Sequence, residues 1–126
     1  KEYVESLHSS MEHITCIADR DTIIAVAGAP KKELLDKRVS PSLERIMEDK
    51  TTVVLSLTGE NKMINISADE EGTPKYTAGV VAPIITQGDS IGAVLLLSKD
   101  PNVQMGELEV KLSETAASFL GKQMEQ

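Results

Sequence analysis

The chain has almost no aromatic residues. Its 126 residues contain Tyr3, Tyr76 and Phe119 and no tryptophan. Bases and sugar rings are often bound by stacking on aromatic side chains, so the sequence offers few such surfaces. Its single cysteine, Cys16, excludes an internal disulfide and a cysteine-based zinc cluster. Folds held together by disulfides or by a zinc–cysteine cluster are therefore ruled out.

Long apolar runs and excess positive charge are also missing. No stretch of 18 apolar residues is present and no secretory signal peptide is visible, so we expect a cytoplasmic protein without a membrane partner. The net charge of −7 argues against binding of a nucleic-acid backbone by this chain itself, because that requires clustered lysine and arginine. A length of 126 residues fits one domain with a real core.

The sequence begins at Lys1, and its first residues already show the apolar periodicity of a helix. Val4, Leu7 and Met11 recur at steps of three and four and form one apolar stripe of a helix that ends near His13. We therefore expect the sequence to be a fragment of a longer protein.

The stretch at residues 76–98, YTAGVVAPIITQGDSIGAVLLLS, predicts a β-hairpin at the centre of the domain. Two apolar runs rich in β-branched residues flank the turn Gln87-Gly88-Asp89, in which Gly88 supplies a positive φ and Asp89 tolerates one. The runs lack polar alternation, so both faces of the sheet are apolar and both must be covered. We predict a three-layer α/β (α+β) domain in which this hairpin is the middle layer.

The other segments supply the edges and covers of that sheet. Strands are predicted at residues 14–19, 22–28 and 52–57, with a further extended run at 63–66 and a solvated acidic loop at 68–74. Short helices are predicted at residues 31–37 and 42–49, the second capped by Ser40 and starting with Pro41. We expect an antiparallel sheet with long N- and C-terminal helices on one face and the short helices on the other.

The last helix, at residues 105–124, carries two apolar stripes. One stripe suffices to pack on the sheet and contains Met105, Leu108, Leu112, Ala116, Phe119 and Leu120. The second contains Val110, Ala117 and Met124 and calls for another helix, so we predict a homo-dimer with a helical interface. The candidate interface residues are Val4, Leu7, Met11, Val110, Leu112, Ala117, Phe119 and Met124.

No combination of residues indicates catalysis. His8 and His13 are five positions apart and do not share a helical face, which disfavours a metal site. Cys16 sits in an apolar strand, where a free cysteine is typically a small buried hydrophobe, although a reactive thiol is an alternative. The acidic run 69–71 is typical of a solvated loop, and Gly88 precedes no helix that would complete a phosphate loop. We expect no enzyme, no catalytic residues, no cofactor and no metal.

A small-molecule pocket is the better prospect. The short helices are too brief to seal one sheet face fully, and cavities of that kind are typical ligand sites. Each candidate residue, taken singly, is also typical of capping, turn bonding or solvent exposure, and both interpretations stay open. The candidates are Arg38, Ser40, Thr51, Asn65, Ser67 and Thr77.

The order of these elements resembles a GAF domain, and three segments carry a closer resemblance. CIADRDTIIAVAGAPKKELLDKRVS at 16–40, GDSIGAVLLLSKD at 88–100 and MGELEVKLSETAASFLGKQMEQ at 105–126 are similar to the C-terminal half of the stage V sporulation protein T family. Those proteins are transcription factors of spore-forming Firmicutes related to the AbrB family. The resemblance covers nearly all of the chain and is weakest at residues 58–75.

This resemblance implies that residues 1–126 form a single GAF-like regulatory and oligomerising domain. An AbrB-type N-terminal domain, absent from this sequence, would bind DNA, and the full-length protein would be a tetramer that controls sporulation genes. The sequence lacks the signatures of cyclic-nucleotide, tetrapyrrole and sulfoxide-reducing GAF domains. Two hypotheses follow: a sensor of an unknown small molecule that modulates DNA binding, or a purely architectural module without a ligand.

Overall fold

The computed structural model of the chain describes residues 13–125. Five strands form one antiparallel sheet in the order β2-β1-β5-β4-β3. The strands are β1 (Ile14–Asp19), β2 (Ile23–Ala27), β3 (Val53–Ser56), β4 (Ala78–Thr86) and β5 (Asp89–Ser98). The predicted central hairpin is confirmed, because β4 and β5 pair along their full length and lie inside the sheet.

A two-residue turn joins β4 to β5. Thr86 pairs with Asp89, and the two residues between them, Gln87 and Gly88, have φ angles of 52° and 85°. Positive φ at both positions suits the right-handed twist of a tight hairpin. Gln87 therefore takes the positive φ that the sequence led us to expect at Asp89, which already belongs to β5.

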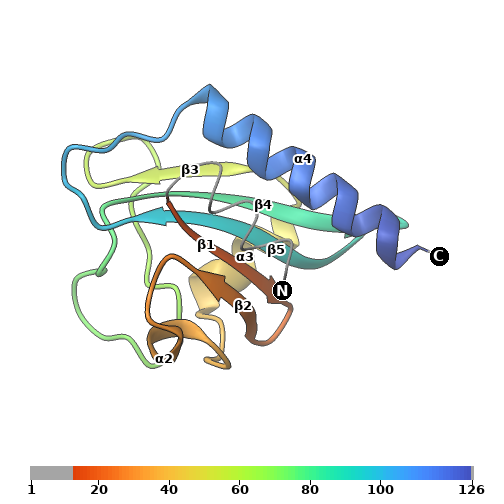
Figure 1. The fold of residues 1–126 in the computed structure, drawn as a ribbon, viewed down its shortest axis with the longest axis horizontal. Coiled ribbons are helices and arrows are strands. Elements are labelled where there is room, and N and C mark those ends of the chain that lie inside the picture. Colours follow the sequence, from red (N-terminus) through yellow and green to blue (C-terminus); the bar gives the residue numbers. More distant parts are fainter. Residues whose placement is uncertain (1–12, 126) are drawn as a thin grey trace.

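Helices cover the two faces of the sheet unequally (Figure 1). The long helix α4 (Glu107–Met124) packs on β4 and β5 from one side. The short helices α2 (Lys31–Leu34) and α3 (Pro41–Asp49) lie on the other side. The predicted arrangement of layers is thus confirmed for the described residues, whereas the predicted N-terminal helix with Val4, Leu7 and Met11 lies outside them.

The predicted extended run at residues 63–66 is not a strand. Single bridges hold its two ends, one between Ser56 and Lys62 and the other between Val39 and Ser67. Between these bridges the segment crosses the short-helix face of the sheet, where Ile66 is fully buried. Its apolar residues serve as part of the cover over the sheet, which explains their extended pattern without strand pairing.

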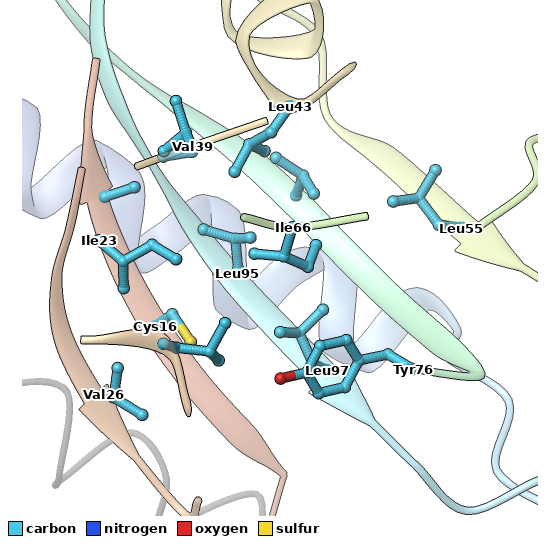
Figure 2. Close-up of a cluster of buried hydrophobic side chains, with 14 of the residues drawn as sticks. Cys16, Ile23, Val26, Val39, Leu43, Leu55, Ile66, Tyr76, Leu95 and Leu97 are labelled. Carbon is cyan, nitrogen blue, oxygen red and sulfur yellow. The ribbon is translucent and has the colours of Figure 1, made fainter. Parts of the chain in front are cut away.

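The main core lies on this short-helix face (Figure 2). Leu95 and Leu97 of β5 meet Leu43 of α3, together with Ile66 and Tyr76, and all five side chains are fully buried. Each Leu side chain removed from water contributes about 1.5–3 kcal/mol. This cluster therefore fixes the short helices and the 63–66 segment on the sheet.

Small residues of α4 face the sheet. Ser113, Ala116, Ala117 and Gly121 are the buried residues of this helix. At Gly121 the helix approaches β4 so closely that a Cβ atom would lie 2.4 Å from the backbone oxygen of Ile85. The hydroxyl of Thr86 donates a 2.8 Å hydrogen bond to the backbone oxygen of Gly121.

The predicted orientation of α4 is therefore wrong in part. Leu108 and Phe119, expected on the sheet-facing stripe, are 66% and 47% exposed. Ala117, expected at a partner interface, is 4% exposed and belongs to the chain's own core. Apolar periodicity shows that a helix has stripes, but it does not show that the small residues pack on the sheet.

The close approach of α4 predicts an inverted effect for Gly121→Ala. Such a change in a helix ordinarily stabilises by about 0.5–1 kcal/mol. Here the added methyl group overlaps backbone of β4, so we expect the free energy of unfolding to fall by about 1–3 kcal/mol. Denaturant unfolding measures the difference.

Ser118→Ala is the matched control, because Ser118 is an exposed residue of the same helix. Its expected effect lies within about 0.5 kcal/mol. A stabilised Gly121→Ala variant would contradict the packing described.

Candidate functional site

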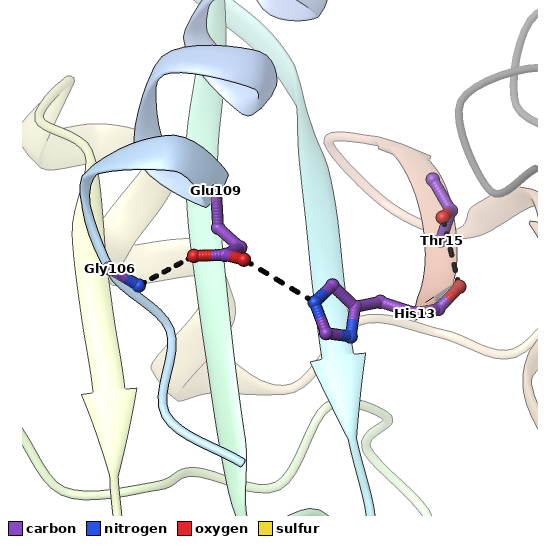
Figure 3. A network of polar contacts seen from close by, with 4 residues as sticks. All are labelled: His13, Thr15, Gly106 and Glu109. Atoms are coloured by element: carbon purple, nitrogen blue, oxygen red, sulfur yellow. Dashed lines mark hydrogen bonds and ion pairs between the residues drawn. The ribbon is translucent and has the colours of Figure 1, made fainter. Parts of the chain in front are cut away.

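The start of α4 is held by a carboxylate rather than by a conventional capping side chain. Gly106 precedes the helix and has no side chain, but Glu109 Oε1 accepts a 2.7 Å hydrogen bond from the Gly106 N–H. Glu109 Oε2 lies 3.6 Å from His13 Nε2 (Figure 3). His13 comes directly before β1, so this ion pair connects the entry of the chain into the sheet with the start of α4.

The surroundings of Glu109 favour its charged form. Burial raises the pKa of this carboxyl, but the N–H groups of Gly106 and of Glu109 itself, together with the His13 side chain, outweigh burial. The pKa of Glu109 therefore lies below its usual range. A carboxylate at this position also suits the positive end of the helix dipole.

The outward surface of α4 carries apolar side chains. Leu108, Leu112, Thr115 and Phe119 follow one another at helical spacing, on the side opposite the buried Ser113, Ala117 and Gly121. Leu108 and Phe119 are largely exposed and Leu112 is half-buried. We call Leu108, Leu112 and Phe119 the outer stripe.

The candidate interface residues separate into three groups. Leu112 and Phe119 belong to the outer stripe, while Met124 is 66% exposed at the end of α4. Val110 is half-buried against the chain's own core, and Ala117 lies within that core. Val4, Leu7 and Met11 lie outside the described residues.

Four of the six pocket candidates come together beside α3. Ser40 caps α3 by accepting a 3.0 Å hydrogen bond from the Leu43 N–H, and its hydroxyl donates to the backbone oxygen of Asn65 over 2.6 Å. Val39 bridges Ser67, and the Ala68 N–H donates to the backbone oxygen of Arg38. Arg38, Ser40, Asn65 and Ser67 therefore join the 63–66 segment to the chain before α3.

Thr51 and Thr77 lie elsewhere. The Thr51 hydroxyl donates to the backbone oxygen of Asp49 at the end of α3. The Thr77 hydroxyl donates to the backbone oxygens of Ser98 and Asp100 at the far end of β5. The six candidates do not line one cavity.

An open cavity of about 390 Å³ lies beside α3 on the short-helix face. Arg45 and Asp49 of α3, together with Glu60 and Lys62, contribute charges of both signs to its lining. All four residues are exposed. The cavity is thus a solvated hollow, and it contains none of the six candidates.

The loop after Ser67 contains one exposed acid and one folded inward. Asp69 accepts hydrogen bonds from the Ser67 hydroxyl at 2.6 Å and from Lys37 at 2.9 Å, which lower its pKa to about 2. Glu70 turns back, and its Oε1 accepts the Ile66 N–H at 3.0 Å. The predicted solvated loop is therefore correct for Asp69 but not for the Glu70 side chain.

Three buried polar atoms near this loop lack a hydrogen-bond partner among the described residues. They are Asn65 Oδ1, Glu70 Oε2 and the Tyr76 hydroxyl oxygen. Buried polar groups are nearly always paired in folded proteins, so each of these three atoms is an exception to that rule. The sequence analysis did not select Glu70 or Tyr76 as candidate site residues. The only signal that could have drawn attention to Tyr76 was the rarity of tyrosine in this chain.

The described residues offer little to support catalysis. Cys16 is fully buried, and this burial raises the pKa of its thiol to about 12, so the thiol stays protonated. No group of three or more histidine, cysteine, aspartate or glutamate residues within 13–125 is arranged to hold a metal ion. In the same range, no helix is long and apolar enough to cross a bilayer.

Known proteins resemble this chain in sequence and in fold. A family model described as "Stage V sporulation protein T C-terminal, transcription factor" matches residues 1–125. Stage V sporulation protein T of Bacillus subtilis (strain 168) is 44% identical over 126 residues, which are 100% of this chain and 67% of that protein.

Two solved GAF domains share the fold. The GAF domain of a phosphoenolpyruvate-protein phosphotransferase from Coxiella burnetii has a TM-score of 0.74 at 16% identity, covering 97% of this chain and 77% of that one. Its counterpart from Acinetobacter has a TM-score of 0.73 at 14% identity, covering 95% and 76%. At such identities the likeness shows the fold alone, and it confirms the predicted GAF-like architecture.

The Glu109 contacts predict a pH-dependent contribution to stability. At neutral pH we expect Glu109→Ala to lower the free energy of unfolding by about 0.5–2 kcal/mol, the usual range for loss of a cap. Because the folded pKa of Glu109 lies below the unfolded value of about 4.3, this contribution is complete above that value. It is lost as the pH falls through the folded pKa.

Unfolding curves of both proteins at several pH values between 7 and acid check this expectation. Glu107→Ala is the control, because Glu107 is an exposed acid of the same helical turn. A Glu109→Ala effect that is independent of pH would show that the carboxylate does not act through its charge.

Proposed function

This chain belongs to the family of the C-terminal domain of stage V sporulation protein T, a transcription factor, and from that premise we propose that it is a domain that oligomerises and regulates such a factor. The family predicted from residues 16–40, 88–100 and 105–126 is confirmed. The chain is the C-terminal domain of a sporulation regulator and has a GAF fold. Its 44% identical relative is a transcription factor rather than an enzyme.

In this proposal residues 1–126 are one regulatory domain, and DNA is bound by an AbrB-type domain outside this sequence. The net charge of −7 supports a separate DNA-binding domain. The greater length of the Bacillus subtilis relative, of which the chain spans 67%, is consistent with one. A role in transcription also supports a cytoplasmic location.

The exposed outer stripe of α4 is the observation that supports oligomerisation. Its sheet-facing side uses small residues, whereas Leu108 and Phe119 are 66% and 47% exposed. Large apolar side chains aligned on one exposed helix face are typical of helix–helix interfaces between subunits. We infer that this stripe forms a homo-dimer. In the full-length protein, contacts made by the additional domain would complete a tetramer.

A regulatory ligand would act from the opposite face of the sheet. The orphaned buried atoms of Asn65, Glu70 and Tyr76 support a small-molecule site there. Neighbouring residues of β5 contact both covers, because Leu97 belongs to the short-helix cluster and Leu96 to the α4 side. A ligand that binds one arrangement of these layers better than another would increase the fraction of molecules in that arrangement. The change would alter the spacing of the DNA-binding domains.

The architectural hypothesis remains the alternative. In it the outer stripe holds the oligomer together and the short-helix face binds nothing. The same exposed Leu108 and Phe119 support it, so the two functions differ in the ligand rather than in the interface.

The outer stripe predicts that Phe119→Glu weakens self-association. A charge buried at a helix–helix interface without a partner costs several kcal/mol, so we expect the dissociation constant to rise by about a hundredfold or more. Sedimentation velocity over a range of concentrations reports the constant. Ser118→Glu adds the same charge at the neighbouring exposed position and should leave the constant nearly unchanged. Equal effects of both variants would argue against the stripe.

The sensor hypothesis predicts a bound molecule. Native mass spectrometry of the full-length protein, purified from spore-forming cells, should show a reproducible extra mass that is lost on denaturation. The reason is that a regulatory ligand stabilises the state it binds and co-purifies when its concentration exceeds its dissociation constant. An oligomer without added mass, whose DNA affinity is unchanged by a cell extract of small molecules, would favour the architectural alternative.

A further inference from the structure

Strand β3 (Val53–Ser56) is an open edge of the sheet (Figure 1). It pairs with β4 and stands last in the strand order, so its other side has no strand partner among the described residues. An edge strand presents main-chain N–H and C=O groups to its surroundings, and an extended segment of another chain can pair with them. The outer side of β3 is therefore a short site for strand addition.

The main-chain groups of Val54 point away from β4. Two hydrogen bonds of 3.0 Å show the direction: the Ser56 N–H donates to the backbone oxygen of Asn61, and the Ser56 oxygen accepts from the Met63 N–H. Inward- and outward-directed residues alternate along an antiparallel strand, so Val54, two residues earlier, also faces outward. Outside the strand ladder, its N–H and C=O make no hydrogen bond within residues 13–125. Val54 thus offers a free donor and a free acceptor, next to a point where β3 already binds a segment of its own chain.

An uncharged cavity of about 360 Å³ lies beside Val54 on the α4 side of the sheet. The Val54 side chain lies on that side, because it packs with Val80 and Met105. We call this cavity the α4-side hollow. It lies between β3, the loop at residues 57–59 and the loop at residues 101–105, and no charged residue lines it. An apolar side chain suits such a lining.

The cavity of about 390 Å³ beside α3 lies on the opposite face of the same strand. Val53 and Leu55 of β3 line it, and both pack in the short-helix cluster. We call this cavity the charged hollow. Its four charged residues take part in no ion pair within the described part of the chain; they are Arg45, Asp49, Glu60 and Lys62. Unpaired charges of both signs suit a partner that brings charges of both signs.

The placement of the two hollows matches an added strand. Side chains of successive strand residues point to opposite faces, and a residue paired opposite Val54 points to the same face as Val54. That residue therefore places its side chain at the α4-side hollow, and its two neighbours place theirs at the charged hollow. Main-chain bonds at a sheet edge, combined with separate pockets for alternate side chains, are how strand addition achieves recognition.

We propose that the outer edge of β3 binds an extended segment of a partner protein by strand addition at Val54. The segment has an apolar residue opposite Val54 and oppositely charged residues on either side of it. An apolar residue fits the α4-side hollow, because a charge buried there would find no partner. The flanking charges complement the unpaired charges of the charged hollow. This inference adds a partner surface to the molecule, and it needs neither the outer stripe nor a small-molecule ligand.

A short peptide tests the proposal. The probe is acetyl-Thr-Glu-Val-Lys-Thr-amide, and the readout is the NMR signal of the Val54 amide in ¹⁵N-labelled protein. We expect a saturable shift that is half-complete at or below about 1 mM peptide. At saturation, hydrogen exchange of this amide should slow by at least about tenfold. The same peptide N-methylated at its central residues should have neither effect, because it keeps the side chains but cannot pair as a strand.

Variants of the protein locate the contact. Val54→Pro removes the outward N–H, and proline is tolerated on an edge strand where that N–H is not part of the ladder. We expect this variant to fold and to bind the peptide at least about tenfold more weakly. Val54→Thr keeps the N–H and the branched shape and should bind within about twofold of the original. If Val54→Pro does not fold, the N-methylated peptide decides the same question.

The charged hollow has its own matched pair of variants. Arg45→Gln removes one of its positive charges and should weaken binding by about twofold to fivefold. Lys32→Gln removes a positive charge from an exposed position of α2 outside both hollows and should leave the affinity unchanged.

Several results would overturn the proposal. Equal effects of the parent and N-methylated peptides, or no shift of the Val54 amide with either, would exclude strand addition. Equal affinity of a peptide with aspartate in place of valine would show that the α4-side hollow does not select an apolar side chain. Equal affinities of Arg45→Gln and Lys32→Gln would remove the charge pattern from the partner. Exchange at Val54 that slows with rising protein concentration, without peptide, would assign the edge to a second copy of this chain instead.

Discussion

The burial of the β4–β5 hairpin on both faces is the constraint on which the rest of the structure depends. Val80 and Leu96 face α4, while Val81, Leu95 and Leu97 face the short helices, and all five are fully buried. Leaving either face open would expose a continuous apolar surface, so each needs its own cover. Among residues 13–125, one long helix, α4, covers one face. Two short helices and the 63–66 segment cover the other face. This cover also buries polar side-chain atoms, among them those of Asn65, Glu70 and Tyr76, that have no hydrogen-bond partner.

The two covers leave different surfaces for function. Because α4 approaches the sheet through Ala117 and Gly121, its large side chains remain on the outside, where Phe119 is 47% exposed. On the other face, the large apolar side chains are buried under the short helices. What remains available for binding there is a set of buried polar atoms without hydrogen-bond partners. In the function proposed above, subunits would associate through the first face, and a small molecule would bind at the second.

The parts that were predictable from sequence are those with a simple periodic signal. The β-branched runs of the hairpin, the cap at Ser40 and the length of the last helix all follow from local rules and agree with the structure. The rotation of α4 about its own axis could not be predicted by such rules. Gly121 and Ala117 face the sheet because their small size lets the helix approach it, not because they are strongly hydrophobic. Ser40 and Asn65 could be chosen as edge residues and do meet, but Glu70 and Tyr76 carry no periodic signal. Their importance depends on burial without a partner, which only three-dimensional packing reveals.

Communication between the two faces would use the alternation of β5. Leu97 packs with Tyr76 in the short-helix cluster, while its neighbour Leu96 packs on the α4 side. A displacement of the β5 backbone at these two residues would therefore change the packing on both faces of the sheet. On the α4 side, small residues let the helix approach the sheet closely, and polar contacts near its two ends also set its position. Glu109 holds its start to Gly106 and His13, and Thr86 holds Gly121 near its end. The Thr86 hydrogen bond attaches α4 to β4, and the Glu109 contact attaches it to His13, directly before β1. A change at the Tyr76 side of the sheet would therefore reach the outer stripe through the strands themselves, without a contact between the two covers.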